Sequence, residues 1–195
     1  MKVLVTGFGP FKDFDKNPSS ILVNDFLKND IIIKKEIFDV NRNDIETRYP
    51  AILESFQPDF ILNIGLNANS GGFNLETFAI NSLKDNSTTS KIKSEIAFQT
   101  DINTIALSDH LSLLGLPSAS SDYAGSYYCN FIYYLSLEWC KKTNSKALFL
   151  HIPFTTELAG EISLNKKKIY PSLPKQLMLN GIDAIINFTN DNLES

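Results

Sequence analysis

The run at residues 59–65 (DFILNIG) constrains the fold of this chain more than any other segment. It is almost continuously apolar, which is typical of a strand buried on both faces of a sheet. The β-rich run at 2–6 (KVLVT) and the apolar run at 147–152 (ALFLHI) have the same character. Strands of this kind need helices on both sides of the sheet, so the three runs predict an α/β fold.

Segments with helical spacing alternate with these strands. Asn17-Pro18-Ser19 supplies a cap and a proline where a first helix should begin. Apolar residues at helical spacing predict further helices at 43–56, 101–114, 126–143 and 174–192. Strands are also predicted at 31–40 and 76–81, and a polar loop at 67–72. We therefore expect a single domain over residues 1–195, folded as an α/β sandwich.

Composition narrows the class of partner. The chain is 43% hydrophobic and 21% charged, with a formal net charge of −4. Nucleic acids and anionic membranes both select cationic surfaces, so neither is expected as a partner. The apolar start of the chain ends at Gly7, which is too early for a signal peptide or a membrane span, and we expect a cytoplasmic protein.

The cysteines and histidines are few. Cys129 and Cys140 fall on one predicted helix, so they cannot form a disulfide framework, and free thiols are expected. The two histidines, His110 and His151, lack the spacing of zinc ligands. No metal and no cofactor is predicted.

Cys129 is a candidate nucleophile because of its place on that helix. If Ser126 caps the helix, Cys129 falls in the first turn, where backbone N–H groups and the helix dipole favour a thiolate. Cys140 lies three turns further on and has no such help. The alternative for Cys129 is a small buried apolar residue.

His151 and Glu76 are the candidate partners of Cys129. His151 stands near the end of a buried strand, at the sheet edge where reacting groups gather in α/β proteins. A lone histidine at such a place is more often a core residue with its hydrogen bonds satisfied than a base. Glu76 lies at the start of an apolar strand, where pairing with a histidine N–H explains a carboxylate. A solvent-facing position at the strand edge explains it as well.

The N-terminal loop carries two aromatic rings three residues apart, Phe8 and Phe11, within Gly7-Phe8-Gly9-Pro10-Phe11. They are placed either to line a small flat pocket or to close the end of the core.

Taken together, the motifs resemble the pyroglutamyl-peptidase I family, also called pyrrolidone-carboxylate peptidases, which are cysteine peptidases. The resemblance rests on four segments in family order: TGFGPF with NPS, ETFAIN, AGSYYCN, and LHIP. The family implies a three-layer α/β/α sandwich with a mixed, mostly parallel central sheet (phosphorylase/hydrolase-like). It also implies self-association as a dimer or tetramer.

The resemblance further implies roles for individual residues. Cys129 is the nucleophile, His151 the general base, and Glu76 the residue that orients the imidazole. The remaining three residues bind substrate: Phe8 and Phe11 receive the pyroglutamyl ring, and Asn17 fixes its pocket. The implied substrates are peptides with an N-terminal pyroglutamate, cleaved through a thioester without a cofactor.

The chain also departs from the family pattern. The region 73–86 looks shortened, and an arginine that lies near the active site in the family has no clear equivalent here. Lys84 supplies a charge at this place but lacks the bidentate geometry of arginine. Two alternatives follow: a divergent cysteine amidase with another acyl specificity, and a catalytically silent relative that binds a lactam or a protein.

Overall fold

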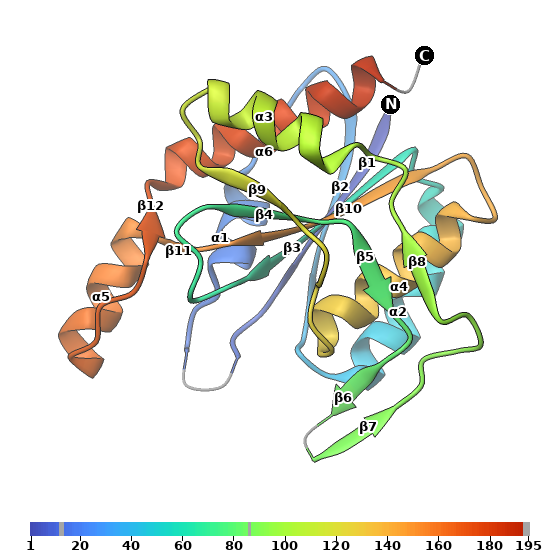
Figure 1. Cartoon of the computed structure of the whole chain (residues 1–195), viewed down its shortest axis with the longest axis horizontal. Coiled ribbons are helices and arrows are strands. Elements are labelled where there is room, and N and C mark those ends of the chain that lie inside the picture. The colour runs from blue at the N-terminus through green and yellow to red at the C-terminus, as the bar shows by residue number, and fades with distance from the viewer. Residues whose placement is uncertain (12–13, 86, 193–195) are drawn as a thin grey trace.

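The computed structural model describes residues 1–11, 14–85 and 87–192, which form a twisted central sheet covered by helices (Figure 1). The strands follow the order β2-β1-β3-β10-β4-β9. Their bounds are β1 (Lys2–Phe8), β2 (Ile32–Phe38), β3 (Phe60–Leu66), β4 (Phe73–Glu76), β9 (Ser118–Ser121) and β10 (Lys146–Ile152). The strands β2, β1, β3 and β10 are parallel, β4 is antiparallel to β10, and β9 is parallel to β4. The mixed, mostly parallel sheet expected from the sequence is confirmed.

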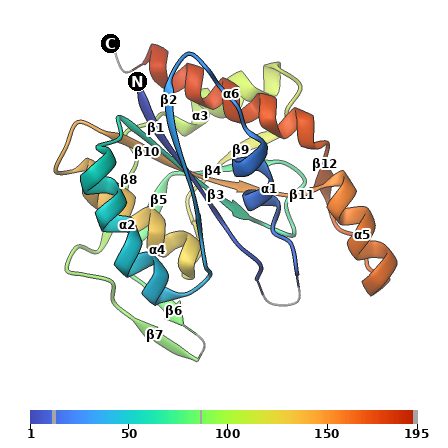
Figure 2. The same ribbon diagram turned by 180° about the vertical axis from the view of Figure 1, so that it is seen from behind.

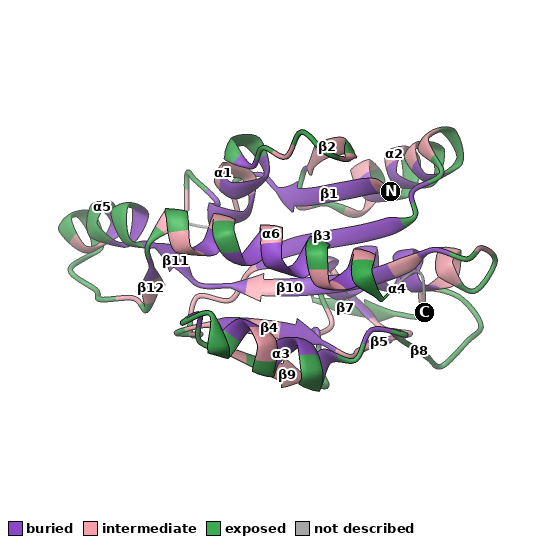
Figure 3. Cartoon of the chain, turned by 90° about the horizontal axis from the view of Figure 1, so that it is seen from above, coloured by how far each residue is buried: buried purple, intermediate pink, exposed green. Residues whose placement is uncertain are grey.

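Helices cover both faces of the sheet (Figure 2). One apolar core joins the sheet to α1 (Pro18–Asp25), α3 (Thr104–Leu113) and α6 (Lys175–Asp191). A second core joins the other face to α2 (Arg42–Phe56) and α4 (Tyr128–Cys140). The central strands between them are almost wholly buried (Figure 3). This arrangement confirms the three-layer sandwich.

The smaller elements lie outside this sheet. They are the pairs β5 (Phe78–Ile80) with β8 (Ala97–Gln99), β6 (Leu83–Asp85) with β7 (Thr88–Ser90), and β11 (Phe154–Thr155) with β12 (Ser172–Leu173), together with α5 (Thr156–Lys166). Among the described residues, no helix is both long and apolar enough to cross a bilayer. The expected domain of residues 1–195 includes positions 12–13, 86 and 193–195, which lie outside the described part.

The single strand predicted at 76–81 is wrong. The chain changes sheets at Thr77, whose N–H donates to the carbonyl of Ser121 at 2.6 Å and whose carbonyl accepts from the N–H of Thr100 at 3.0 Å. Glu76 is therefore the last residue of β4, and a separate short strand, β5, follows it.

The predicted cap of the cysteine-bearing helix is also wrong by one residue. The carbonyl of Ser126 accepts a hydrogen bond from the N–H of Lys84 at 2.6 Å, which holds Ser126 in the preceding loop. Tyr127 is the N-cap, and it makes no side-chain cap hydrogen bond. Cys129 still falls in the first turn of α4.

At Gly65 the strand β3 lies directly against the side chain of Cys129 on α4. A Cβ atom at this position would lie 2.7 Å from Cζ of Phe149 and 3.0 Å from Sγ of Cys129. Phe149 is fully buried, so its ring has no open space to move into. Only glycine lets the thiol of Cys129 rest directly over the end of β3.

We predict that Gly65→Ala destabilises the protein by about 1–3 kcal/mol, because the added methyl group overpacks a closed site. Gly71→Ala is the matched control, since a Cβ there would meet no atom within 4 Å. Thermal unfolding of the two variants and the wild type measures the difference. Equal unfolding temperatures for the two variants would contradict the close packing described here.

Candidate active site

Strand β10 brings the two predicted partners of Cys129 together through its register. His151 lies opposite Gly65 of β3 on one side and opposite Asn74 of β4 on the other. Glu76 lies two residues beyond Asn74 and is opposite Phe149. Because alternate residues of a strand share a face, the side chains of Glu76 and His151 point to the same side as diagonal neighbours.

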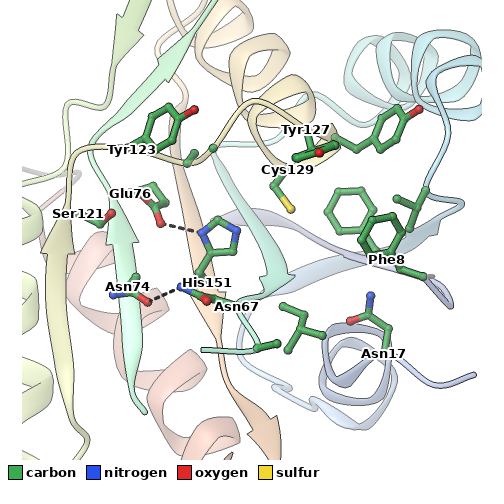
Figure 4. Close-up of a pocket in the computed structure, with 17 residues that line it drawn as sticks. Phe8, Asn17, Asn67, Asn74, Glu76, Ser121, Tyr123, Tyr127, Cys129 and His151 are labelled. Carbon is green, nitrogen blue, oxygen red and sulfur yellow. Dashed lines mark hydrogen bonds and ion pairs between the residues drawn. The ribbon is translucent and has the colours of Figure 1, made fainter. Parts of the chain in front are cut away.

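The Glu76 carboxylate binds the His151 ring directly. Oε1 of Glu76 lies 2.7 Å from Nδ1 of His151, as the dashed line in Figure 4 marks. A carboxylate can only accept, so Nδ1 carries the hydrogen and Nε2 is left for a second partner. The backbone of Glu76 is fixed as well, since the hydroxyl of Tyr133 donates to its carbonyl at 2.7 Å. The geometry is that of a carboxylate orienting an imidazole.

Glu76 is buried almost completely, with 2% of its surface exposed. Its second carboxylate oxygen, Oε2, has no hydrogen-bond partner among the described residues. A buried carboxylate needs a compensating charge, and the ring of His151 is the partner it contacts. The solvent-facing alternative for Glu76 is therefore wrong.

Cys129 completes the group from the first turn of α4. Burial lowers the pKa of His151, but hydrogen bonds to Cys129 and Glu76, together with their negative charges, outweigh burial and raise that pKa from 6.5 to about 9. An imidazole with such a pKa stays protonated near neutral pH beside a thiol. A protonated imidazole next to a cysteine side chain is the pairing that histidine-activated cysteine nucleophiles use.

The helix itself contributes to the site. The first N–H groups of a helix have no intrahelical acceptor, and at α4 the N-cap side chain does not satisfy them. Cys129 lies among these N–H groups, in the first turn of α4. Cys140 ends the same helix, and burial raises the pKa of its thiol to about 12. Both cysteines are free thiols.

Asn130, the neighbour of Cys129, ties the start of α4 to β5, and the motif-based assignment of site residues did not include it. Its fully buried carboxamide accepts from the N–H of Ile80 at 2.8 Å and donates to the carbonyls of Ile80 and Ser82 at 2.9 and 2.8 Å. These bonds tie β5 and the residues after it to α4, next to Cys129. The sequence signal was an asparagine within an otherwise apolar helix, directly after the cysteine.

Glu76, Cys129 and His151 line a pocket of about 380 Å³. The pocket lies at the carboxyl ends of the parallel strands β1, β3 and β10, where α/β folds place their ligands. Its lining includes all six residues singled out from the sequence: Phe8, Phe11, Asn17, Glu76, Cys129 and His151. Figure 4 shows Phe8 and Asn17 across Cys129 from His151 and Glu76.

The aromatic loop residues have more than one part in the structure. Phe8 is 3% exposed and belongs to the core below α4, yet it also lines the pocket, so both interpretations of this ring hold. Asn17 is the N-cap of α1, accepting from the N–H of Ser19 at 3.1 Å. Its amide also donates to the carbonyl of Gly9 at 3.0 Å. Asn17 thus fixes the chain directly after Phe8, where β1 ends.

Lys84, the possible substitute for the missing family arginine, does not line this pocket but lies beside a residue that does. Its Nζ is 5.6 Å from the ring centre of Tyr127, one of the lining residues. Within the described part of the chain, no three His, Cys, Asp or Glu side chains are grouped so that they could hold a metal ion.

Curated relatives resemble the chain over nearly its whole length. A pyrrolidone-carboxylate peptidase of Brachyspira hyodysenteriae is 31% identical over 202 residues, covering 95% of this chain and 97% of the relative. Pyrrolidone-carboxylate peptidase 1 of Saccharolobus solfataricus is 31% identical over 208 residues, covering 98% and 96%.

Solved structures share the fold. The pyrrolidone carboxyl peptidase of Pyrococcus furiosus superimposes with a TM-score of 0.92 at 24% identity, covering 99% of this chain and 100% of the other. The enzyme of Thermococcus litoralis gives 0.89 at 24% identity, covering 99% and 94%. The sequence model of the pyroglutamyl peptidase family matches residues 1–191. With its fold, its pocket and this match in agreement, the chain belongs to the pyroglutamyl peptidase family.

Proposed function

We propose that this protein is a cysteine peptidase that removes an N-terminal pyroglutamyl residue from peptides. The observation that carries the proposal is the contact of Glu76 with His151, and of His151 with Cys129, inside a pocket of a pyroglutamyl peptidase family member. An orienting carboxylate, a base and a nucleophile in contact are the parts that acyl transfer requires.

The reaction begins with attack of the Cys129 thiolate on the carbonyl carbon of the pyroglutamyl residue. The resulting oxyanion lies against the first N–H groups of α4. The C–N bond then breaks as the imidazolium of His151 gives its proton to the leaving nitrogen, and the shortened peptide departs. His151, now neutral, takes a proton from water, which attacks the thioester and releases pyroglutamate and the thiolate. Glu76 stabilises the charged ring in each cycle.

We call the part of the pocket lined by Phe8, Phe11 and Asn17 its acyl end. This end suits a flat, uncharged ring. A pyroglutamyl residue has no free α-amine, so an anionic anchor for an amine serves no purpose there. The aromatic rings of Phe8 and Phe11 offer faces to a lactam, which carries one N–H donor and one carbonyl acceptor. Asn17 supports this end by holding the chain directly after Phe8 in position.

The position of Lys84 bears on specificity. A cation beside Tyr127, one of the lining residues, supports retention of the family's charge, though without the two parallel hydrogen bonds of an arginine. A divergent amidase with another acyl preference is therefore the second candidate. Comparing pyroglutamyl with prolyl and glutaminyl amides separates the two. A catalytically silent relative is disfavoured because Cys129 is present together with the paired Glu76 and His151.

The proposal includes the cellular compartment and the oligomeric state of the protein. A cytoplasmic location suits free thiols at Cys129 and Cys140, which a reducing compartment preserves. Self-association as a dimer or tetramer is supported by large apolar side chains exposed on or beside α3, namely Ile105 (66% exposed), Leu113 (88%) and Leu114 (57%).

We expect Cys129→Ala to abolish release of fluorophore from a pyroglutamyl coumarylamide under reducing conditions, since no other group in the pocket can form the thioester. The matched control is Cys140→Ala, which removes the thiol at the far end of the same helix and should keep wild-type turnover. Iodoacetamide should inactivate the wild type and the Cys140→Ala variant alike. Turnover by the Cys129→Ala variant at the wild-type rate would refute the mechanism.

The raised pKa of His151 predicts an alkaline limit. Below pH 6.5 the imidazolium is charged in both the folded and unfolded chain, and its pairing stabilises the fold fully. This contribution is lost as the pH rises through about 9, and with it the proton needed by the leaving nitrogen. We therefore expect kcat/KM for the coumarylamide to fall through about pH 9.

Glu76→Gln should lower kcat by about a hundredfold or more and move this alkaline limit to lower pH, because the imidazolium loses its anionic partner. Glu157→Gln, the same substitution at an exposed position of α5, is the control. The pH profiles of kcat/KM for both variants provide the measurement. An unmoved limit in Glu76→Gln would show that the carboxylate does not set the pKa of His151.

A further inference from the structure

The pocket has two ends, separated by Cys129 and His151. Figure 4 shows Phe8 and Asn17 at one end, and Tyr123, Ser121 and Asn74 at the other, on the side of His151 and Glu76. The proposed mechanism uses the first end for the acyl group. It gives no part to Tyr123, Ser121 or Asn74.

The direction of proton transfer relates these ends to the two halves of the substrate. Nδ1 of His151 is occupied by Glu76, so Nε2 is the atom that serves both the thiol and the leaving nitrogen. During acylation the S–C bond forms, the C–N bond breaks, and the proton on Nε2 moves to the departing nitrogen. The leaving nitrogen must therefore lie on the His151 side of the carbonyl carbon. With the acyl ring at Phe8, the departing peptide extends over the end that holds Tyr123.

At the end of the pocket that holds Tyr123, several polar side-chain atoms make no hydrogen bond within the described part of the chain. Nδ2 of Asn74 donates to no described residue, while its Oδ1 lies 3.4 Å from Nδ2 of Asn67. The hydroxyl groups of Ser121 and Tyr123 also make no hydrogen bond within the described part. Among the described residues that line the pocket, Glu76 and His151, which bind each other, are the charged pair, and the lining contains no other carboxylate, amine or guanidinium group. This end suits an uncharged peptide segment.

Tyr123 is exposed but firmly anchored. The residue is 58% exposed although it lines the pocket. The carbonyl of Ser121, two residues before it, accepts from the N–H of Thr77 at 2.6 Å. Ala124, which follows it, is buried, and Gly125 then turns the chain into α4 with a positive φ of 85°. The ring therefore stands on a fixed segment and gains contact area only when something covers it.

We propose that Tyr123 and Asn74 form the subsite for the departing peptide, with the Tyr123 ring as a platform for the side chain that follows pyroglutamate and Asn74 Nδ2 as a donor to the peptide backbone. This inference rests on the proposed function. It assigns the subsite an aromatic or large aliphatic residue and disfavours glycine, which leaves the ring uncovered.

Two peptides with the same acyl group test the assignment: pyroglutamyl-phenylalaninamide and pyroglutamyl-glycinamide. They form the same thioester, so the ratio of their kcat/KM values reports only the departing side. The wild type should favour the phenylalanine peptide. Tyr123→Ala should reduce this ratio roughly two- to tenfold, the size expected for one aromatic contact. Tyr123→Phe should retain the ratio, because it keeps the ring.

Controls separate the subsite from the rest of the enzyme. Asp122→Ala changes the exposed neighbour of Tyr123, which does not line the pocket, and should retain the wild-type ratio. Inhibition by free pyroglutamate probes the acyl end alone and should keep its wild-type strength in Tyr123→Ala. Asn74→Ala should reduce kcat/KM more for both peptides than for the coumarylamide, which lacks the backbone carbonyl beyond the cleaved bond.

Three results would overturn the assignment: an unchanged ratio in Tyr123→Ala, an equal loss in Tyr123→Phe, or weaker inhibition by pyroglutamate in Tyr123→Ala. The last result would place Tyr123 at the acyl end. A failure of the proposed function is a different observation, since the wild type would then release no fluorophore from the pyroglutamyl coumarylamide.

Discussion

The site depends on the pairing of β10 with a parallel strand on one side and an antiparallel strand on the other. The parallel neighbour, β3, sets Gly65 beside His151 and so leaves room for the thiol. The antiparallel neighbour, β4, sets Glu76 diagonally across from the same ring. A shift of β4 by one residue would turn Glu76 to the opposite face, because side chains alternate along a strand. The relative position of Glu76 and His151 is thus set by strand register. The first turn of α4 then places Cys129 next to this pair.

Much of this arrangement could be predicted from the sequence because it follows from apolar patterning. The buried strands around 2–6, 59–65 and 147–152 are nearly continuous apolar runs, and all three lie at the centre of the sheet. The strand β9 could not be predicted in this way, since Ser118–Ser121 consists of serine and alanine and carries no β signal of its own. It forms because β4 offers it an edge. The helix α5 was missed for a related reason: its apolar residues pack in a small cluster around Phe154, separate from the two large cores.

The site residues divide along the same line. Cys129, His151 and Glu76 were found through ordered motifs, yet their contact is a tertiary fact that spacing cannot supply, since Glu76 and His151 are separated by 75 positions. Ser126 was assigned a capping role from its residue type alone, but its carbonyl is bound to Lys84 and the helix begins later. Asn130 was missed because its partners are backbone groups, which a sequence does not display.

The burial of the Glu76 carboxylate, whose Oε2 has no hydrogen-bond partner among the described residues, limits how such a protein can change over evolutionary time. The carboxylate is buried, and its ion-pair partner is the ring of His151. Loss of His151 alone would strand a negative charge inside the protein, at a cost of about 3–5 kcal/mol, which is a large part of the stability of a domain. Loss of Cys129 leaves the ion pair of Glu76 and His151 intact, so no buried charge loses its partner. A lineage that abandons catalysis can therefore lose Cys129 in a single substitution. His151 and Glu76 must instead be replaced together, or they are retained as a pair that no longer serves catalysis.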